Sequence, residues 1–102
     1  MAKIRAIIKR PDEEYGHMTN ISGTLENLQN TVGGYIEAVP LTDELVVICN
    51  EEGKLRGYEP NMLLPWGDML VGTIIILGVD GDEFTDIPIT FKTWKELVDK
   101  WS

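Results

Sequence analysis

Two apolar segments constrain the fold more than any other feature of this chain. Leu45 to Cys49 reads Leu-Val-Val-Ile-Cys, and Thr73 to Val79 contains three consecutive isoleucines. A strand that buries one face alternates apolar and polar residues, whereas these segments are apolar on both faces and belong inside a covered sheet. The chain has 102 residues, enough for one modest core. We therefore predict a single compact domain, residues 1–102, built around these two strands.

Shorter patterns predict the neighbouring strands. Alternation of apolar and polar residues, turn chemistry and hairpin spacing carry these predictions. Further strands are expected at Lys3–Lys9, Tyr15–Ile21, Tyr35–Val39, Lys54–Tyr58, and from the Asp80-Gly81 turn through Phe84 and Ile87. Pro60, Pro65 and Gly67 predict a loop around Asn61 and Trp66.

Helical spacing predicts two helices. Leu25, Leu28 and Val32 fall on one side of a short helix that Ser22 or Thr24 caps and Gly33 ends. The apolar residues of the last segment have the same spacing from Phe91 to Trp101.

In the second helix, Thr93 and Glu96 fit a capping box, which would start the regular helix at Trp94. Hairpin-joined strands with two separated helices indicate an α+β fold. We expect a mainly antiparallel sheet of about five to seven short strands with two short helices. If these helices leave part of a sheet face uncovered, self-association into a homo-oligomer follows.

The charge distribution narrows the class of partner. The chain has 9 basic and 17 acidic residues, a formal net charge of −8, and residues 11–91 hold only Lys54 and Arg56 against fifteen acids. Such a surface repels phosphate, so we expect neither general nucleic-acid binding nor membrane binding. The negative net charge favours solubility, contact with a basic protein, or competition with nucleic acid for a basic groove. One cysteine and no signal peptide indicate a cytoplasmic protein.

Residues that carry catalysis or bind metals are scarce. One cysteine and one histidine give no paired ligand spacing. Cys49 lies in an apolar run, where a thiol is usually inert, and the neighbours Glu51 and Glu52 are expected to point apart. We therefore predict no catalytic residue, no metal, no cofactor and no enzymatic activity.

Binding residues are expected at turns and in the proline-flanked loop. Gly33-Gly34 ends a helix and leaves backbone bare for a ligand or partner. Trp66 either covers the core or anchors an interface. The candidate ligand- or partner-binding residues are Gly33, Gly34, Tyr35, Asn50, Glu51, Glu52, Lys54, Arg56, Asn61 and Trp66.

Several blocks of the sequence resemble one family. The blocks are Val-Gly-Gly-Tyr-Ile-Glu-Ala-Val at 32–39, Leu-Val-Val-Ile-Cys-Asn-Glu-Glu-Gly-Lys-Leu at 45–55, and Pro60-Asn61. Together they resemble the domain of unknown function DUF3846, although Pro65-Trp66-Gly67 and the Trp-rich tail depart from its pattern. The resemblance implies a small accessory protein of phages, plasmids or other mobile elements, acting in the cytoplasm of a bacterial host. It implies no catalytic residue.

Three hypotheses follow. The first is a non-enzymatic binding protein whose acidic surface contacts a host or element-encoded protein, with counter-defence as one such role. The second is an oligomeric protein that sequesters a signalling nucleotide, with Tyr35 stacking on the base and Lys54 or Arg56 meeting a phosphate. The third is an enzyme, which would need catalytic residues that converge only in three dimensions. A structural domain whose acidic residues only keep it soluble is the remaining alternative.

Overall fold

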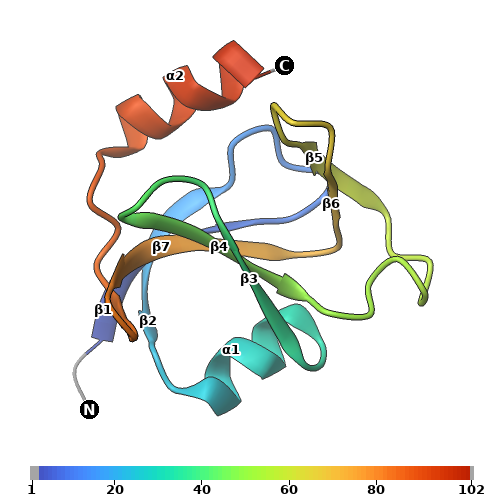
Figure 1. Cartoon of the computed structure of the whole chain (residues 1–102), viewed down its shortest axis with the longest axis horizontal. Helices are drawn as coiled ribbons and strands as arrows, with labels where there is room; N and C mark the ends of the chain where they lie inside the picture. The colour runs from blue at the N-terminus through green and yellow to red at the C-terminus, as the bar shows by residue number, and fades with distance from the viewer. Residues whose placement is uncertain (1–2, 102) are drawn as a thin grey trace.

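The computed structural model describes residues 3–101, which form eight strands and two helices (Figure 1). In chain order they are β1 (Lys3–Lys9), β2 (His17–Ser22), α1 (Leu25–Val32), β3 (Ile36–Pro40), β4 (Leu45–Asn50), β5 (Pro60–Leu63), β6 (Met69–Val71), β7 (Ile74–Asp80), β8 (Glu83–Thr85) and α2 (Phe91–Trp101).

The strands form one main antiparallel sheet and a small second sheet. The main sheet runs β2-β1-β7-β4-β3, with β8 also paired to β7, and β5 pairs with β6. Each pairing is antiparallel. This confirms the predicted α+β fold with a mainly antiparallel sheet and two helices.

The two apolar segments lie at the centre of the main sheet, as predicted for Leu45 to Cys49. Ile74 to Leu77 in β7 are all 0% exposed, because each face of the sheet is covered. Helix α1 packs on the face that holds Ile75 and Leu77, whereas α2 and the β5–β6 hairpin pack on the face of Ile74 and Ile76 (Figure 1). This coverage removes our reason for expecting self-association, and the oligomeric state stays a prediction.

Both helix starts use a threonine cap. The Thr24 hydroxyl accepts a hydrogen bond from the Asn27 N–H at 3.2 Å, as one of the two predicted caps. The prediction for α2 is wrong, because the helix begins at Phe91 rather than Trp94. Thr90 Oγ1 accepts from the Thr93 N–H at 3.1 Å, so Thr93 lies inside the first turn and is not the cap.

Residues 51–57 form consecutive turns, so the predicted strand at 54–58 is wrong. The Arg56 N–H donates to the Glu52 carbonyl at 2.9 Å and the Tyr58 N–H to the Gly53 carbonyl at 3.0 Å. These local bonds satisfy the backbone groups that a strand would pair with a neighbour.

The predicted loop around Asn61 and Trp66 is a hairpin, and the strand predicted through Ile87 ends earlier. β5 and β6 pair across a turn closed by the Leu64 N–H and the Asp68 carbonyl at 2.8 Å. Pro60 stands at the first position of its strand, where a missing N–H is tolerated. β8 ends at Thr85, and Ile87 instead donates its N–H to the Arg5 carbonyl of β1.

Candidate functional site

Three of the predicted binding residues build the corner where α1 ends and β3 begins. Gly33 ends the helix with φ 88°, and its N–H donates to the Gln29 carbonyl at 2.8 Å. The Asn50 side chain is buried, donates to the Val32 carbonyl at 3.2 Å and accepts from the Glu52 N–H at 2.7 Å. A Cβ on Gly34 would lie 2.9 Å from the Asn50 amide nitrogen. The amide of Asn50 is therefore committed to holding the helix end.

Most of the predicted residues at this corner line two separate pockets. Gly33, Gly34, Tyr35 and Arg56 line a shallow pocket of about 450 Å³. Asn50, Glu51 and Lys54 line a smaller pocket of about 160 Å³ on the other side of the turn, together with Glu37 and Asp68. The structure thus brings eight of the ten predicted residues to one corner without converging them on one site.

Ion pairs occupy both cations of this corner. Lys54 Nζ lies 3.1 Å from an Asp68 carboxylate oxygen, and Arg56 Nη2 lies 3.4 Å from a Glu52 oxygen. Tyr35 is 68% exposed, so its ring is available for stacking beside Arg56.

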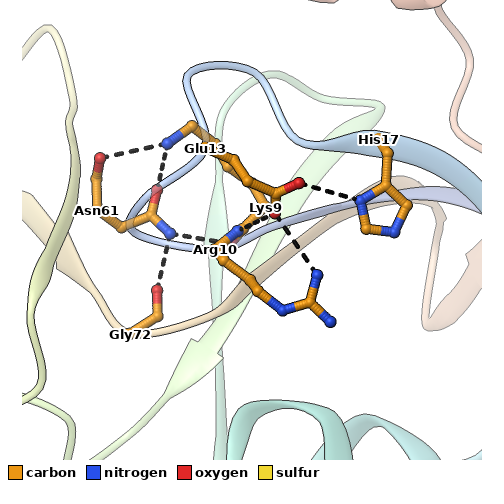
Figure 2. A network of polar contacts seen from close by, with 6 residues as sticks. All are labelled: Lys9, Arg10, Glu13, His17, Asn61 and Gly72. Atoms are coloured by element: carbon orange, nitrogen blue, oxygen red, sulfur yellow. Dashed lines mark hydrogen bonds and ion pairs between the residues drawn. The ribbon is translucent and has the colours of Figure 1, made fainter.

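Asn61 lies at a different corner, where it holds a buried lysine (Figure 2). Lys9 is 3% exposed, and its Nζ donates to Asn61 Oδ1 at 2.7 Å and to the Asn61 carbonyl at 3.3 Å. The Asn61 amide nitrogen donates in turn to the carbonyls of Lys9 at 2.9 Å and of Gly72 at 2.8 Å. One side chain therefore joins the end of β1, the start of β5 and the connection from β6 to β7.

A hollow in the surface opens beside this lysine. We call it the acidic cleft; its volume is about 680 Å³. Its lining comes from the 10–16 loop, β5 and the end of α2. The carboxylates are Asp12, Glu13, Glu14 and Asp99, the apolar side chains are Met62, Leu63, Val98 and Trp101, and Lys9, Pro11 and Asn61 complete it.

The loop that carries three of these carboxylates is held in place. The Arg10 N–H donates to a Glu13 carboxylate oxygen at 2.8 Å, and a second Glu13 oxygen lies 3.3 Å from His17 Nδ1 (Figure 2). Trp94 Nε1 donates to the Tyr15 carbonyl at 2.9 Å, and the Tyr15 hydroxyl donates to Asp99 at 2.6 Å. The loop and α2 are thereby fixed against each other.

The ionisable groups around the acidic cleft respond to these contacts. The backbone N–H of Arg10, and to a lesser degree His17, lower the pKa of Glu13, which keeps it ionised. Burial lowers the pKa of Lys9, while Glu13 and Glu14 act in the opposite direction. The hydrogen bond to Asp99 raises the pKa of the Tyr15 phenol, because the neutral hydroxyl is the donor.

Trp66 and Cys49 lie apart from the acidic cleft. Trp66 is 55% exposed at the tip of the β5–β6 hairpin, so it does not cover the core. Cys49 is buried. This burial and, to a lesser degree, the negative charge of Glu37 raise the pKa of its thiol to about 11. A thiol of this kind is a poor nucleophile at neutral pH.

Apart from Asn61, sequence reasoning missed the residues that form the acidic cleft. Pro11 to Glu14 reads only as a polar turn, and Lys9 reads as an outward-facing residue of an alternating strand. Three consecutive acids in one turn are the signal that could have pointed to this place. Asp99 is contributed by the last helix, and nothing local links it to the turn.

Two further properties concern residues 3–101. In this part of the chain no group of three or more His, Cys, Asp or Glu side chains is placed to hold a metal ion. Within the same residues, neither helix is long and apolar enough to cross a membrane.

The fold and its two polar corners define a small α+β domain with an acidic cleft at one end of its sheet. A family model described as a domain of unknown function, DUF3846, matches residues 4–99. The chain therefore belongs to the DUF3846 family, as the sequence blocks indicated. Comparison with curated proteins and with solved structures found no match.

Proposed function

We propose that this chain is a non-enzymatic binding protein that contacts a basic region of another protein at the acidic cleft. The observation that carries this proposal is the make-up of the cleft, in which four carboxylates surround an apolar lining. A lysine or arginine side chain pairs an aliphatic stem with a charged head, so both parts find a matching surface here.

The electrostatics of the acidic cleft favour such a partner. Lys9 is the one cation among the lining residues, and its Nζ is engaged by Asn61. The lining residues alone carry a net charge of −3 (one cation minus four acids), and Arg10, which lies outside the lining, pairs with Glu13 at 3.7 Å. The net charge of −8 on the whole chain extends the attraction beyond contact distance.

The non-enzymatic part of the proposal is supported by how the reactive groups are used. The Cys49 thiol is buried with a raised pKa, the Lys9 amine is bonded to Asn61, and His17 contacts Glu13 on an exposed surface. Each of these groups has a structural partner. We further propose that the partner is a host or element-encoded protein and that the chain is an accessory protein of a phage or other mobile element in a counter-defence role. The family resemblance supports that part.

A capture experiment with charge-matched variants tests the proposal. The tagged chain, the cleft variant Asp12→Asn/Glu14→Gln and the control Asp82→Asn/Glu83→Gln are incubated with bacterial lysate at 50 mM and 400 mM NaCl. The control also removes two negative charges, but at the other end of β7. Lys9, beside the cleft, pairs with Ile74 at the start of β7, whereas Glu83 pairs with Asp80 at its end.

We expect one basic protein to be retained by the wild type and the control, and at least about tenfold less by the cleft variant at low salt. The difference should shrink at high salt, because exposed charges are screened within a few ångströms. Equal retention by the cleft variant and the control would contradict a role for the acidic cleft.

One observation favours a second candidate, sequestration of a nucleotide. Tyr35 is highly exposed and lines the same pocket as Arg56 and two glycines, which would place a base and a phosphate side by side. Thermal unfolding in the presence of linear and cyclic adenine and guanine nucleotides tests it. A rise in Tm with one nucleotide that is absent in Tyr35→Ala supports this candidate, whereas no shift with any of them removes it.

A further inference from the structure

One edge of the main sheet is open at β3. β3 is the last strand in the order β2-β1-β7-β4-β3 and pairs with β4 alone. The Glu51 N–H donates to the Tyr35 carbonyl at 2.8 Å, and the Leu41 N–H donates to the Leu45 carbonyl at 2.8 Å. These bonds fix which residues of β3 point their backbone groups toward β4.

The alternation of an antiparallel ladder then identifies the outward groups. Because Tyr35 faces Glu51 as a hydrogen-bonded pair, Glu37 and Val39 also bond to β4. The N–H and C=O groups of Ile36 and Ala38 therefore point away from the sheet. Pro40, at the next outward position, has no N–H and limits any added strand to a few residues.

The charges beside this edge are negative. Glu37 and Glu51 are both exposed, and in the described chain neither takes part in a salt bridge, whereas Lys54 is paired with Asp68 and Arg56 with Glu52. Glu37, Glu51 and Asp68 also line the small pocket of about 160 Å³ that adjoins the strand. Two other strands of the main sheet pair with one neighbour only: β2 carries no acidic residue and only His17 as an ionisable side chain, and the three-residue β8 carries Glu83.

We propose that the β3 edge receives an extended, lysine- or arginine-containing segment of the partner as an added strand. The outward N–H and C=O groups of Ile36 and Ala38 supply the main-chain bonds. Side chains of an added strand alternate between the two faces, so a basic residue directed to the Glu37 face meets Glu37 and Glu51, which have no salt-bridge partner among the described residues, whereas Asp68 is held by Lys54. The proposal rests on the proposed function for the sign of the partner's charge, and it concerns a different surface.

A second copy of this chain is the less suitable occupant. A symmetric antiparallel pairing that uses both outward N–H groups places Ile36 opposite Ala38 of the other copy. Glu37 then lies directly opposite Glu37, and like charges in that position destabilise a sheet. The net charge of −8 on each copy adds to the repulsion.

Peptide probes test the proposal directly. The isotope-labelled chain is titrated with acetyl-Lys-Thr-Lys-Val-Lys-Thr-amide at 25 mM NaCl and followed by amide chemical shifts and hydrogen exchange. Two comparison peptides replace every lysine by glutamate or the central valine by proline. We expect the basic peptide to slow exchange of the Ile36 and Ala38 amides at least about tenfold, and the two comparison peptides to leave them unchanged.

Two kinds of variant separate backbone pairing from charge. Ala38→Pro removes one outward donor and no bond to β4, so affinity for the basic peptide should fall about tenfold or more while the fold is retained. Glu37→Lys should weaken binding to a similar degree, whereas the control Glu26→Gln on α1 should not. If Ala38→Pro does not fold, Glu37→Lys still decides the result.

Each remaining outcome overturns the proposal. Binding that shifts only residues of the acidic cleft would leave the proposed function standing and remove the β3 edge as a site. Absence of binding, or protection of Ile36 and Ala38 that depends on protein concentration without peptide, would contradict it too, the latter in favour of self-pairing. Conversely, equal retention of the partner by the Asp12→Asn/Glu14→Gln variant and its control would not change what the peptide titration shows about the β3 edge.

Discussion

Replacing Asn61 by alanine should be among the most damaging single changes in this protein. The substitution removes three side-chain hydrogen bonds at once, two donated to the carbonyls of Lys9 and Gly72 and one accepted from Lys9 Nζ. It also leaves the ammonium group of Lys9, a residue only 3% exposed, with the carbonyl of residue 61 at 3.3 Å. The damage therefore comes from groups that stay in place without partners.

The size of the effect follows from typical hydrogen-bond energies. A neutral bond contributes about 1 kcal/mol and a bond to a charged group about 1.5–3 kcal/mol. Asn61 is half-buried, so water replaces part of the loss. We expect the free energy of unfolding to fall by about 3 kcal/mol. For a domain of this size that corresponds to a drop in Tm of about 12–24 °C.

Urea denaturation followed by the fluorescence of buried Trp94 measures this loss. The control is Asn20→Ala, an exposed position on β2, which should change stability by less than about 0.5 kcal/mol. Combining Asn61→Leu with Lys9→Met should recover part of the lost stability, because the double variant removes the buried charge that has no partner. A loss below about 1 kcal/mol for Asn61→Ala, or recovery of nothing in the double variant, would refute the reasoning.

The same site predicts a pH dependence. Burial lowers the pKa of Lys9 in the folded protein from its ordinary value of 10.5. Below this lowered pKa the buried ammonium group reduces the free energy of unfolding. The reduction disappears as pH rises to 10.5, where the unfolded chain also loses the proton. The reduction is larger without Asn61. The stability gap between wild type and Asn61→Ala should therefore narrow as pH rises toward 10.5, and a gap that widens would contradict this assignment.

Three further outcomes are expected. Gly78→Ala should lower stability by more than about 2 kcal/mol in thermal unfolding, because its Cβ would clash with the Asp86 carbonyl oxygen; an unchanged Tm would refute this. The Cys49 thiol, whose pKa rises from 9.0 to about 11, should react with a disulfide reagent at pH 8 about 100-fold more slowly than in the unfolded chain, and equal rates would show that it is ionised or exposed. Thr24→Ala should cost about 1 kcal/mol in urea denaturation through loss of the α1 cap, whereas Thr24→Ser should cost little.

Local chemistry explains which parts of the fold could be predicted from sequence. The central strands are recognisable because both faces are apolar, and the ends of α1 because Thr24 and Gly33 carry their own capping signals. The β5–β6 hairpin was missed because prolines at 60 and 65 are typical of loops. The pairing also depends on residues on the far side of the turn. The cap of α2 was misplaced because two threonines compete and only Thr90 has the right geometry.

The candidate site was harder to predict, because it forms by convergence of distant residues. The Gly33–Tyr35 corner and Arg56 come together, but Asn50 turns inward to hold the helix end. Lys9 follows the alternation of an exposed position, yet β5 covers it with an asparagine 52 residues away. No periodicity within β1 contains that information.

Amide hydrogen exchange of the chain with and without its captured partner tests the central claim most directly. Partner binding at the acidic cleft should slow exchange at residues 12–15 and 98–101 by at least about tenfold at low salt, with the effect lost in Asp12→Asn/Glu14→Gln. Protection that leaves these residues unchanged and appears only at 29–35 and 56, or no change at any residue, would contradict the account.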